Sequence, residues 1–202
     1  MNVFDSNQLL EASEILKKGG LISFPTETVF GFGVIFDNKE AYNRLIEVKR
    51  RPPEKPFTLM CADVDDISKY AYVNDKAMKL INKFVPGQFT IILKAKNNLP
   101  SFVVSKDGNV GIRIPDYEMV RDLIRKVGKP LLVPSANRSG EKPLLTSKEV
   151  IDNFKDEIDA IILGETNSSI PSTIVLIDDD IQIIREGIIK KDDVMNALKE
   201  DK

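Results

Sequence analysis

Short apolar runs alternate along this chain with longer segments in which apolar side chains recur every third or fourth position. The runs are typical of buried strands, and the longer segments, such as that of Leu9, Ala12 and Leu16, are typical of amphipathic helices. This alternation favours an α/β fold. Strands are expected at residues 21–24, 57–61, 89–95, 110–114, 131–133, 160–163, 173–177 and 181–184, and helices at 9–16, 41–48, 77–84, 120–127, 194–198 and after 146.

Capping residues mark several of the expected helix starts, because their side chains accept hydrogen bonds from the first helical turn. The candidates are Asp5 with Ser6 as an N-cap region, and Asp37 with Glu40 and Thr146 with Glu149 as capping boxes.

The last two expected strands are separated only by a short acidic connection at residues 178–180, which predicts a hairpin. A hairpin is antiparallel, so a purely parallel sheet is excluded. The chain has 202 residues and neither an internal repeat nor an obvious linker. We therefore expect a single domain over residues 1–202, built on a twisted, open, mixed sheet with flanking helices.

Composition narrows the chemistry. The chain has no histidine and one cysteine, Cys61, so histidine-activated nucleophiles and thiolate zinc sites are excluded. Cys61 lies in an apolar run and is interpreted as a packing residue. The remaining side chains suit the positioning of phosphates around a hard cation such as Mg²⁺.

Charge and hydropathy bear on location and partners. The net charge is −2, so the protein as a whole does not attract nucleic acid. No apolar run approaches the roughly 20 residues of a membrane span, and the first residues do not resemble a signal peptide. A cytoplasmic protein without membrane association is expected.

A basic segment between prolines, residues 48–56, contains Lys49, Arg50, Arg51 and Lys55. If the chain is extended there, Lys49 and Arg51 point to the same side and could clamp a polyphosphate. The alternative is a solvated basic surface run.

Further polar residues stand where expected strands end, which is where open α/β sheets bind ligands. Thr26 and Thr28 follow one strand and suit a small polar ligand, although a strand-to-helix turn also explains them. Ser135 and Asn137 follow another strand and could orient phosphate or ribose, or simply form a turn.

Three residues near later strands are also candidates. Arg113 interrupts an apolar strand, where it binds a ligand carboxylate or forms a structural ion pair. Ser172 begins a strand and Arg185 ends one. Either could be an ordinary polar residue at the end of a strand, and Arg185 could also reach a nucleotide.

Seven motifs in this order resemble those of the YrdC-type threonylcarbamoyl-AMP synthase family. They include the Pro-Thr-Glu-Thr turn, Lys-x-Arg-Pro, Gly-Ile-Arg-x-Pro and Ser-x-Asn-x-Ser-Gly. The matching residues are 25–28, 49–52, 86–90, 111–115, 135–140, 172–175 and 185–187.

The resemblance implies a nucleotidyltransferase with a twisted open sheet and a positively charged concave face. Such enzymes condense L-threonine, bicarbonate and ATP, with Mg²⁺, into threonylcarbamoyl-AMP and pyrophosphate. Downstream enzymes then transfer the threonylcarbamoyl group to adenosine in tRNA. The basic face could also contact tRNA or double-stranded RNA.

The resemblance also implies roles for individual residues. Lys49 and Arg51 would be catalytic, and the metal would be held mainly by ATP. The implied ATP-binding residues are Lys49, Arg51, Ser135, Asn137 and Arg185. The implied threonine-binding residues are Thr26, Arg113 and Ser172.

Some positions depart from the family pattern. Phe30 and Phe32 replace the usual Tyr and Leu, and Met60 stands where many members have histidine. Residues 57–63 are similar to those of YciO-like paralogues, which tend to lack the Lys-x-Arg and Ser-x-Asn pair found here. A YciO-like paralogue with another activity and an RNA-binding module without synthase activity are the alternatives.

Overall fold

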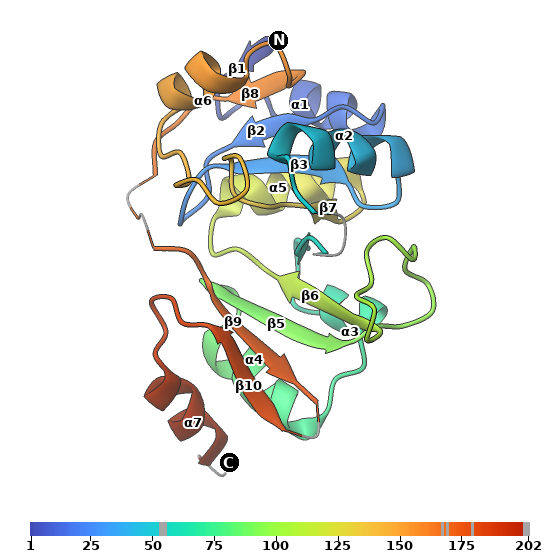
Figure 1. The fold of residues 1–202 in the computed structure, drawn as a ribbon, viewed down its shortest axis with the longest axis vertical. Coiled ribbons are helices and arrows are strands. Elements are labelled where there is room, and N and C mark those ends of the chain that lie inside the picture. The colour runs from blue at the N-terminus through green and yellow to red at the C-terminus, as the bar shows by residue number, and fades with distance from the viewer. Residues whose placement is uncertain (53–55, 167, 169, 179, 200–202) are drawn as a thin grey trace.

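A mixed β-sheet runs through the whole molecule (Figure 1). The computed structural model describes residues 1–52, 56–166, 168, 170–178 and 180–199. In this part of the chain the strands are β1 (Asn2–Phe4), β2 (Ile22–Phe24), β3 (Gly31–Ile35), β4 (Leu59–Met60), β5 (Phe89–Lys94), β6 (Asn109–Arg113), β7 (Leu131–Leu132), β8 (Ala160–Ile162), β9 (Thr173–Ile177) and β10 (Ile181–Arg185). The helices are α1 (Leu9–Lys17), α2 (Lys39–Lys49), α3 (Asp66–Tyr70), α4 (Asp75–Phe84), α5 (Glu118–Val127), α6 (Ser147–Phe154) and α7 (Lys191–Lys199).

The strand order is β1-β8-β2-β3-β7-β4-β6-β5-β9-β10. Strand β8 is parallel to β1 and β2, β4 is parallel to β6, and β5 is parallel to β9. The other neighbouring pairs are antiparallel, including β9 and β10. The single α/β domain with a mixed sheet is therefore confirmed, as is the late hairpin, although Asp179 lies outside the described residues.

Figure 1 shows two halves joined by the short strands at the middle of the sheet. The upper half contains β1, β8, β2, β3 and β7 with α1, α2, α5 and α6, and the lower half contains β6, β5, β9 and β10 with α3, α4 and α7. Helices α1 and α5 pack over one face of the upper sheet, with Leu16 and Leu123 in a shared core cluster. The larger core cluster unites residues of α2, α4, α6 and α7.

Several boundaries differ from those expected. The N-cap of α1 is Gln8 and that of α2 is Asn38, whose side chain accepts from two backbone N–H groups at 3.0 Å, so the predictions at Asp5–Ser6 and Asp37 are wrong. The box of Thr146 with Glu149 is confirmed.

The strand β3 was not predicted. It follows the Pro-Thr-Glu-Thr turn and pairs with β2, so the turn joins two strands rather than a strand and a helix. A Cβ on Gly33 would lie 2.5 Å from the Phe24 ring, which explains why glycine stands in this strand. Among the described residues, no helix combines the length and apolar character of a membrane span.

Candidate functional site

A cavity of about 750 Å³ lies between the two halves of the sheet. Its lower boundary follows from the two-residue period of β-strands. In β5 and β9 the residues Ile91 and Val175 point into the core, whereas Thr90, Ile92 and Ile174 line the cavity. Helices cover the core face of these strands and leave the cavity face open to a ligand.

We call the polar residues of this side the strand wall: Thr90, Arg113, Ser172 and Arg185. The hydroxyls of Thr90 and Ser172 lie 2.9 Å apart on the adjacent strands β5 and the start of β9. Arg185 donates from Nη2 to Ser172 Oγ at 3.1 Å and from Nε to the Ser172 carbonyl at 2.9 Å. Desolvation and then the nearby charge of Arg113 lower the pKa of Arg185. Arg185 therefore contacts one of two paired hydroxyls, and Arg113 lies near enough for its charge to act on Arg185.

Arg113 is 8% exposed and is held from behind by Glu27, with Nη2 2.8 Å from Glu27 Oε1. Its Nη2 also donates to Thr28 Oγ1 at 3.3 Å. The Nε of Arg113 and Oε2 of Glu27 are buried without a hydrogen-bond partner. Arg113 is thus both a structural ion-pair partner of Glu27 and a cation that lines the cavity.

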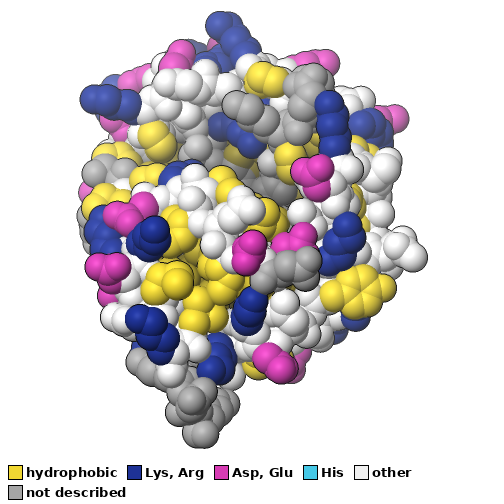
Figure 2. Space-filling model, turned by 60° about the horizontal axis from the view of Figure 1, so that its bottom comes forward, with side chains coloured by type: hydrophobic (Ala, Val, Ile, Leu, Met, Phe, Trp, Pro, Cys, Tyr) yellow, Lys and Arg dark blue, Asp and Glu magenta, His cyan; other side chains and the backbone are white. Residues whose placement is uncertain are grey.

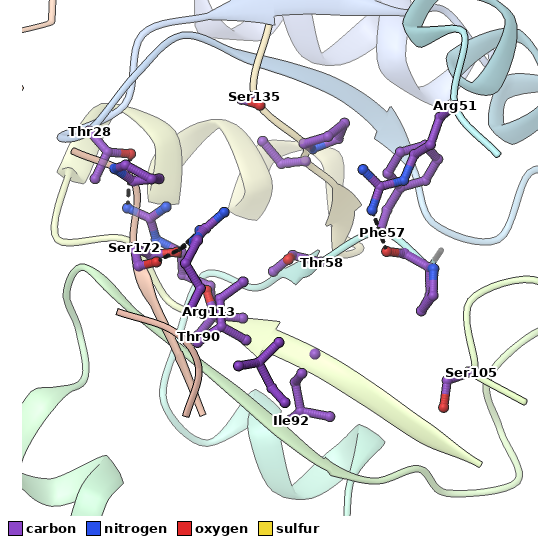
Figure 3. A pocket seen from close by; sticks show the side chains of 18 of the residues that line it. Thr28, Arg51, Phe57, Thr58, Thr90, Ile92, Ser105, Arg113, Ser135 and Ser172 are labelled. Carbon is purple, nitrogen blue, oxygen red and sulfur yellow. Dashed lines mark hydrogen bonds between the residues drawn. The ribbon is translucent and has the colours of Figure 1, made fainter. Parts of the chain in front are cut away.

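The opposite side, which we call the loop wall, consists of Arg51, Ser135 and Asn137. Figure 3 shows Arg51 and Ser135 across the cavity from Arg113 and Ser172. Arg51 lies just after the C-terminus of α2, and Ser135 and Asn137 lie in the loop after β7. Lys55 of the same basic segment lies outside the described residues.

The prediction that Lys49 and Arg51 point to the same side of an extended chain is wrong. Lys49 is the last residue of α2, and Arg50 caps the helix in the left-handed region, with φ 48° and ψ 45°. Arg51 N–H returns to the Ile46 carbonyl at 3.1 Å. Because of this helix-ending turn, the Lys49 side chain packs against the Ser135–Asn137 loop and the Arg51 side chain lines the cavity.

Arg51 reaches the cavity, where its Nη2 donates to the Pro56 carbonyl at 3.2 Å and its Cζ lies 4.9 Å from the centre of the Phe57 ring. Burial lowers the pKa of its guanidinium group, while Tyr42 has the opposite effect.

Lys49 is 2% exposed and, among the described residues, is not part of the cavity lining. Its Nζ donates to the carbonyls of Ser135 and Asn137 at 2.5 and 2.9 Å and to Asn137 Oδ1 at 3.0 Å. Burial, followed by the charge of Arg51, lowers its pKa to about 7. The contacts place Lys49 directly behind the loop wall.

Asn137 is the centre of a hydrogen-bond network in this loop. Its Oδ1 also accepts from Ser135 Oγ at 2.6 Å, and its Nδ2 donates to the carbonyls of Arg138 and Glu141 at 2.8 and 2.7 Å. The backbone N–H of Ser139 donates to the Lys49 carbonyl at 2.8 Å. The Ser-x-Asn motif and α2 therefore form one hydrogen-bonded unit.

Thr26 organises its own turn instead of lining the cavity described here. Its Oγ1 donates to the Val29 carbonyl at 2.7 Å and lies 2.9 Å from Thr28 Oγ1, and Thr28 is the member that lines the cavity. Six of the eight predicted site residues thus line one cavity, and Lys49 and Thr26 each contact a lining residue from behind.

The cavity has lining residues that sequence reasoning missed. The connection between β5 and β6 contributes Ser105, Lys106 and Asp107, and the residues before β4 contribute Phe57 and Thr58. A polar connection has no hydrophobic periodicity to identify it, although the Lys-Asp-Gly stretch at residues 106–108 is a turn signal. Within the described residues, no group of three or more His, Cys, Asp or Glu side chains could hold a metal ion.

The fold and cavity define an α/β protein with a cavity rich in cations and hydroxyls between the two halves of its sheet. The Sua5_yciO_yrdC family model, described as "Telomere recombination", matches residues 14–187. The chain belongs to this family.

Two relatives are informative by sequence, and one of them also has a solved structure. A Methanocaldococcus jannaschii protein named "Putative threonylcarbamoyl-AMP synthase" is 41% identical over 182 residues, which covers 87% of this chain and 86% of that protein. Escherichia coli YciO is 32% identical over 181 residues, with 88% of both proteins covered. The solved E. coli YciO structure matches with a TM-score of 0.84 over 93% of this chain and 94% of that one, at 29% identity.

A solved structure of P. abyssi Sua5 complexed with L-threonine matches with a TM-score of 0.92 at 26% identity. It covers 98% of this chain, but this chain spans only 61% of the Sua5 chain. The fold is therefore shared with both branches of the family, one of which has a structure with threonine bound.

Proposed function

We propose that this protein is a threonylcarbamoyl-AMP synthase, which condenses L-threonine, bicarbonate and ATP and releases pyrophosphate. The observation that carries the proposal is the union of the loop wall and the strand wall in one cavity. Such a cavity can hold an anionic nucleotide and an amino acid next to each other, which is the arrangement that a condensation requires. The resemblance to a named synthase and to a threonine-bound Sua5 supports this proposal.

In this proposal Arg51, Ser135 and Asn137 bind the nucleotide and its phosphates, and Arg185 joins them from the strand wall. Arg113 binds the threonine carboxylate together with Ser172. Thr26 acts on the threonine through Thr28, to which its hydroxyl is hydrogen-bonded. Lys49 contributes its charge and its hydrogen bonds from behind the loop wall.

The chemistry needs no nucleophile from the protein. The threonine amine attacks the carbon of CO₂ and loses a proton, or attacks bicarbonate and expels its hydroxyl group, which leaves as water with a proton from the amine. Either route gives a carbamate. A carbamate oxygen then attacks the α-phosphorus of ATP, and pyrophosphate leaves. Positioning and charge stabilisation by arginines are sufficient forms of catalysis for such a transfer. A chain without histidine can supply both.

Mg²⁺ fits this site as an ion held mainly by the phosphates of ATP. Two carboxylates, Asp107 and Glu141, are available in the cavity lining to contact it or its waters. The ion would neutralise phosphate charge. Threonylcarbamoyl-AMP is a reactive mixed anhydride, so the proposal includes downstream enzymes that transfer its acyl group to tRNA.

The test is pyrophosphate release from ATP and Mg²⁺ with threonine and bicarbonate each present or omitted. We expect release only when both are present, and mass spectrometry should detect the acyl adenylate. Release that is independent of either substrate would contradict the proposal. Nucleotide binding without condensation would favour the YciO-like alternative. The 32% identity to YciO is the reason to test this alternative.

A further inference from the structure

An aromatic cluster lies directly behind Arg51. The Arg51 guanidinium carbon is 4.9 Å from the centre of the Phe57 ring, and the Phe57 ring meets Tyr42 edge-on at 5.7 Å. Tyr42 in turn packs against Phe102 at 4.7 Å between ring centres. Lys39 Nζ lies 4.5 Å from the Tyr42 ring centre and 4.6 Å from that of Phe102. The cluster therefore runs without a break from the cavity to the surface.

The rings come from separate parts of the fold. Tyr42 belongs to α2, Phe57 precedes β4, and Phe102 lies in the connection between β5 and β6, residues 95–108. Figure 1 shows this connection extending from the lower half toward α2. Phe102 attaches it there, while Ser105 and Lys106 of the same connection line the cavity. The cluster thus joins the two halves beside the mouth of the cavity.

The two inner rings have fixed positions. Phe57 and Tyr42 are 3% and 4% exposed, and burial raises the pKa of Tyr42 despite the nearby charge of Arg51. A second hollow of about 280 Å³ lies along Tyr42 and Phe102 and shares Pro56, Ser105 and Lys106 with the main cavity. Movement of Phe102 would therefore alter both the cavity wall and the support of Tyr42.

The physical consequence concerns the entropy of Arg51. A long, flexible side chain loses rotamer freedom when it binds a phosphate, and this loss weakens binding. The Phe57 face and the Pro56 carbonyl, which accepts from Arg51 at 3.2 Å, limit that freedom before any ligand arrives. Figure 3 shows Phe57 beneath the Arg51 side chain, whose guanidinium group points into the cavity.

We propose that Phe57, Tyr42 and Phe102 are positioning residues that preorganise Arg51 for phosphate binding, with the 95–108 connection as the outer support. They act through Arg51 and are not catalytic residues. The value of this preorganisation for nucleotide binding rests on the proposed function.

The first experiment measures the order of Arg51 in the ligand-free protein by ¹⁵N relaxation of its side-chain Nε–H. Phe57→Leu and Phe102→Leu should both lower the order parameter, with the larger change for Phe57→Leu. Tyr72→Leu is the matched control, because Tyr72 is also a ring beneath a cation, Lys96 at 5.6 Å, but belongs to neither hollow. Unchanged order of Arg51 in both cluster variants would overturn the proposal.

The second experiment measures the Kd of ATP and, separately, of L-threonine by calorimetry. We expect the ATP Kd to rise about 5- to 10-fold in Phe57→Leu and about 2- to 4-fold in Phe102→Leu, in line with the energy of a partly buried cation–π contact. The threonine Kd should stay within about 2-fold of the parent value, as expected for a change worth less than about 0.5 kcal/mol.

The same substitutions in an Arg51→Ala background separate positioning from a general structural effect. Phe57→Leu and Phe102→Leu should add no further loss of ATP affinity there, because their partner is gone. An undiminished loss would overturn the positioning role. Phe102 is outside the main cavity lining and half-buried, so its variant remains informative even if Phe57→Leu is unstable. A parent protein that does not bind ATP refutes the proposed function, whereas the order of Arg51 still decides whether the cluster positions it.

Discussion

The two walls of the cavity are built by different means. The strand wall takes Arg113 and Thr90 from the neighbouring strands β6 and β5 and Ser172 from the residue before β9, and the pleat directs their side chains to one face. The loop wall depends on a left-handed helix cap at Arg50 and on a buried ammonium group that binds the Ser135–Asn137 loop. Strand geometry is regular, so the backbone sets the face of each strand residue, and Glu27 then fixes the guanidinium group of Arg113. A loop needs additional contacts to fix its conformation, and here the hydrogen bonds from Lys49 provide them.

Lys49→Ala should have the largest effect, because it removes the donor for three oxygens of the loop wall. We expect turnover to be lost and the free energy of unfolding to fall by about 2–4 kcal/mol, since the carbonyl oxygens of Ser135 and Asn137 lose the hydrogen bonds that Lys49 donates. Lys148→Ala, an 83% exposed lysine, should change unfolding by less than about 0.5 kcal/mol. Chemical denaturation and pyrophosphate release measure both effects. A stable, fully active Lys49→Ala protein would contradict the loop-wall interpretation.

Arg51→Ala and Arg113→Ala should show that the loop wall binds ATP and the strand wall binds threonine. Arg51→Ala is expected to lower kcat by about 100- to 1,000-fold and to raise the KM for ATP, as expected for removal of a charge that stabilises the transition state. Arg113→Ala should raise the KM for threonine most. Steady-state kinetics with each substrate varied in turn measure the split. If both variants change the two KM values equally, the walls do not have separate ligands.

Glu27→Gln should sharpen the description of the strand wall. The change removes the negative charge that lies 2.8 Å from the buried Arg113. Glutamine is about as large as glutamate, and residue 27 is not part of the cavity lining. We expect the KM for threonine to rise about 10-fold, equivalent to about 1.4 kcal/mol, with the KM for ATP unchanged. Glu118→Gln, in an exposed ion pair with Arg125, is the matched control and should have no effect on either KM.

The last expected effect is a pH dependence of stability. The pKa of Lys49 is lowered from 10.5 to about 7 in the folded protein, so the unfolded chain binds more protons between these values. Its contribution to the free energy of unfolding therefore rises as pH increases through this window, by at most about 1.4 kcal/mol per pH unit. The difference in unfolding free energy between the parent and Lys49→Met should be larger at pH 9 than at pH 7. A difference that is constant or falls would show that the pKa of Lys49 is not lowered.

Much of the strand wall could be predicted from the sequence. Arg113 interrupts an apolar run and Ser172 begins one, so their candidacy as cavity residues follows from a local pattern. The loop wall could not be predicted in the same way. Lys49 and Arg51 have the same spacing in an extended chain and in a helix-ending turn, and only the φ of Arg50 separates the two outcomes. Non-glycine residues in that region are uncommon, and Arg-Arg-Pro is not a signal for it.

The order of apolar runs indicated a mixed α/β sheet, which the structure confirms, and the absence of histidine limited the side chains available for any chemistry. Tertiary structure decided the direction of each cation. It turned Lys49 into a buried support and Arg51 into a cavity residue, and it brought Phe102 from a distant connection to the rings behind Arg51. The physical reason is that hydrogen bonds and ring contacts of this kind join residues remote in sequence, and no local periodicity records them.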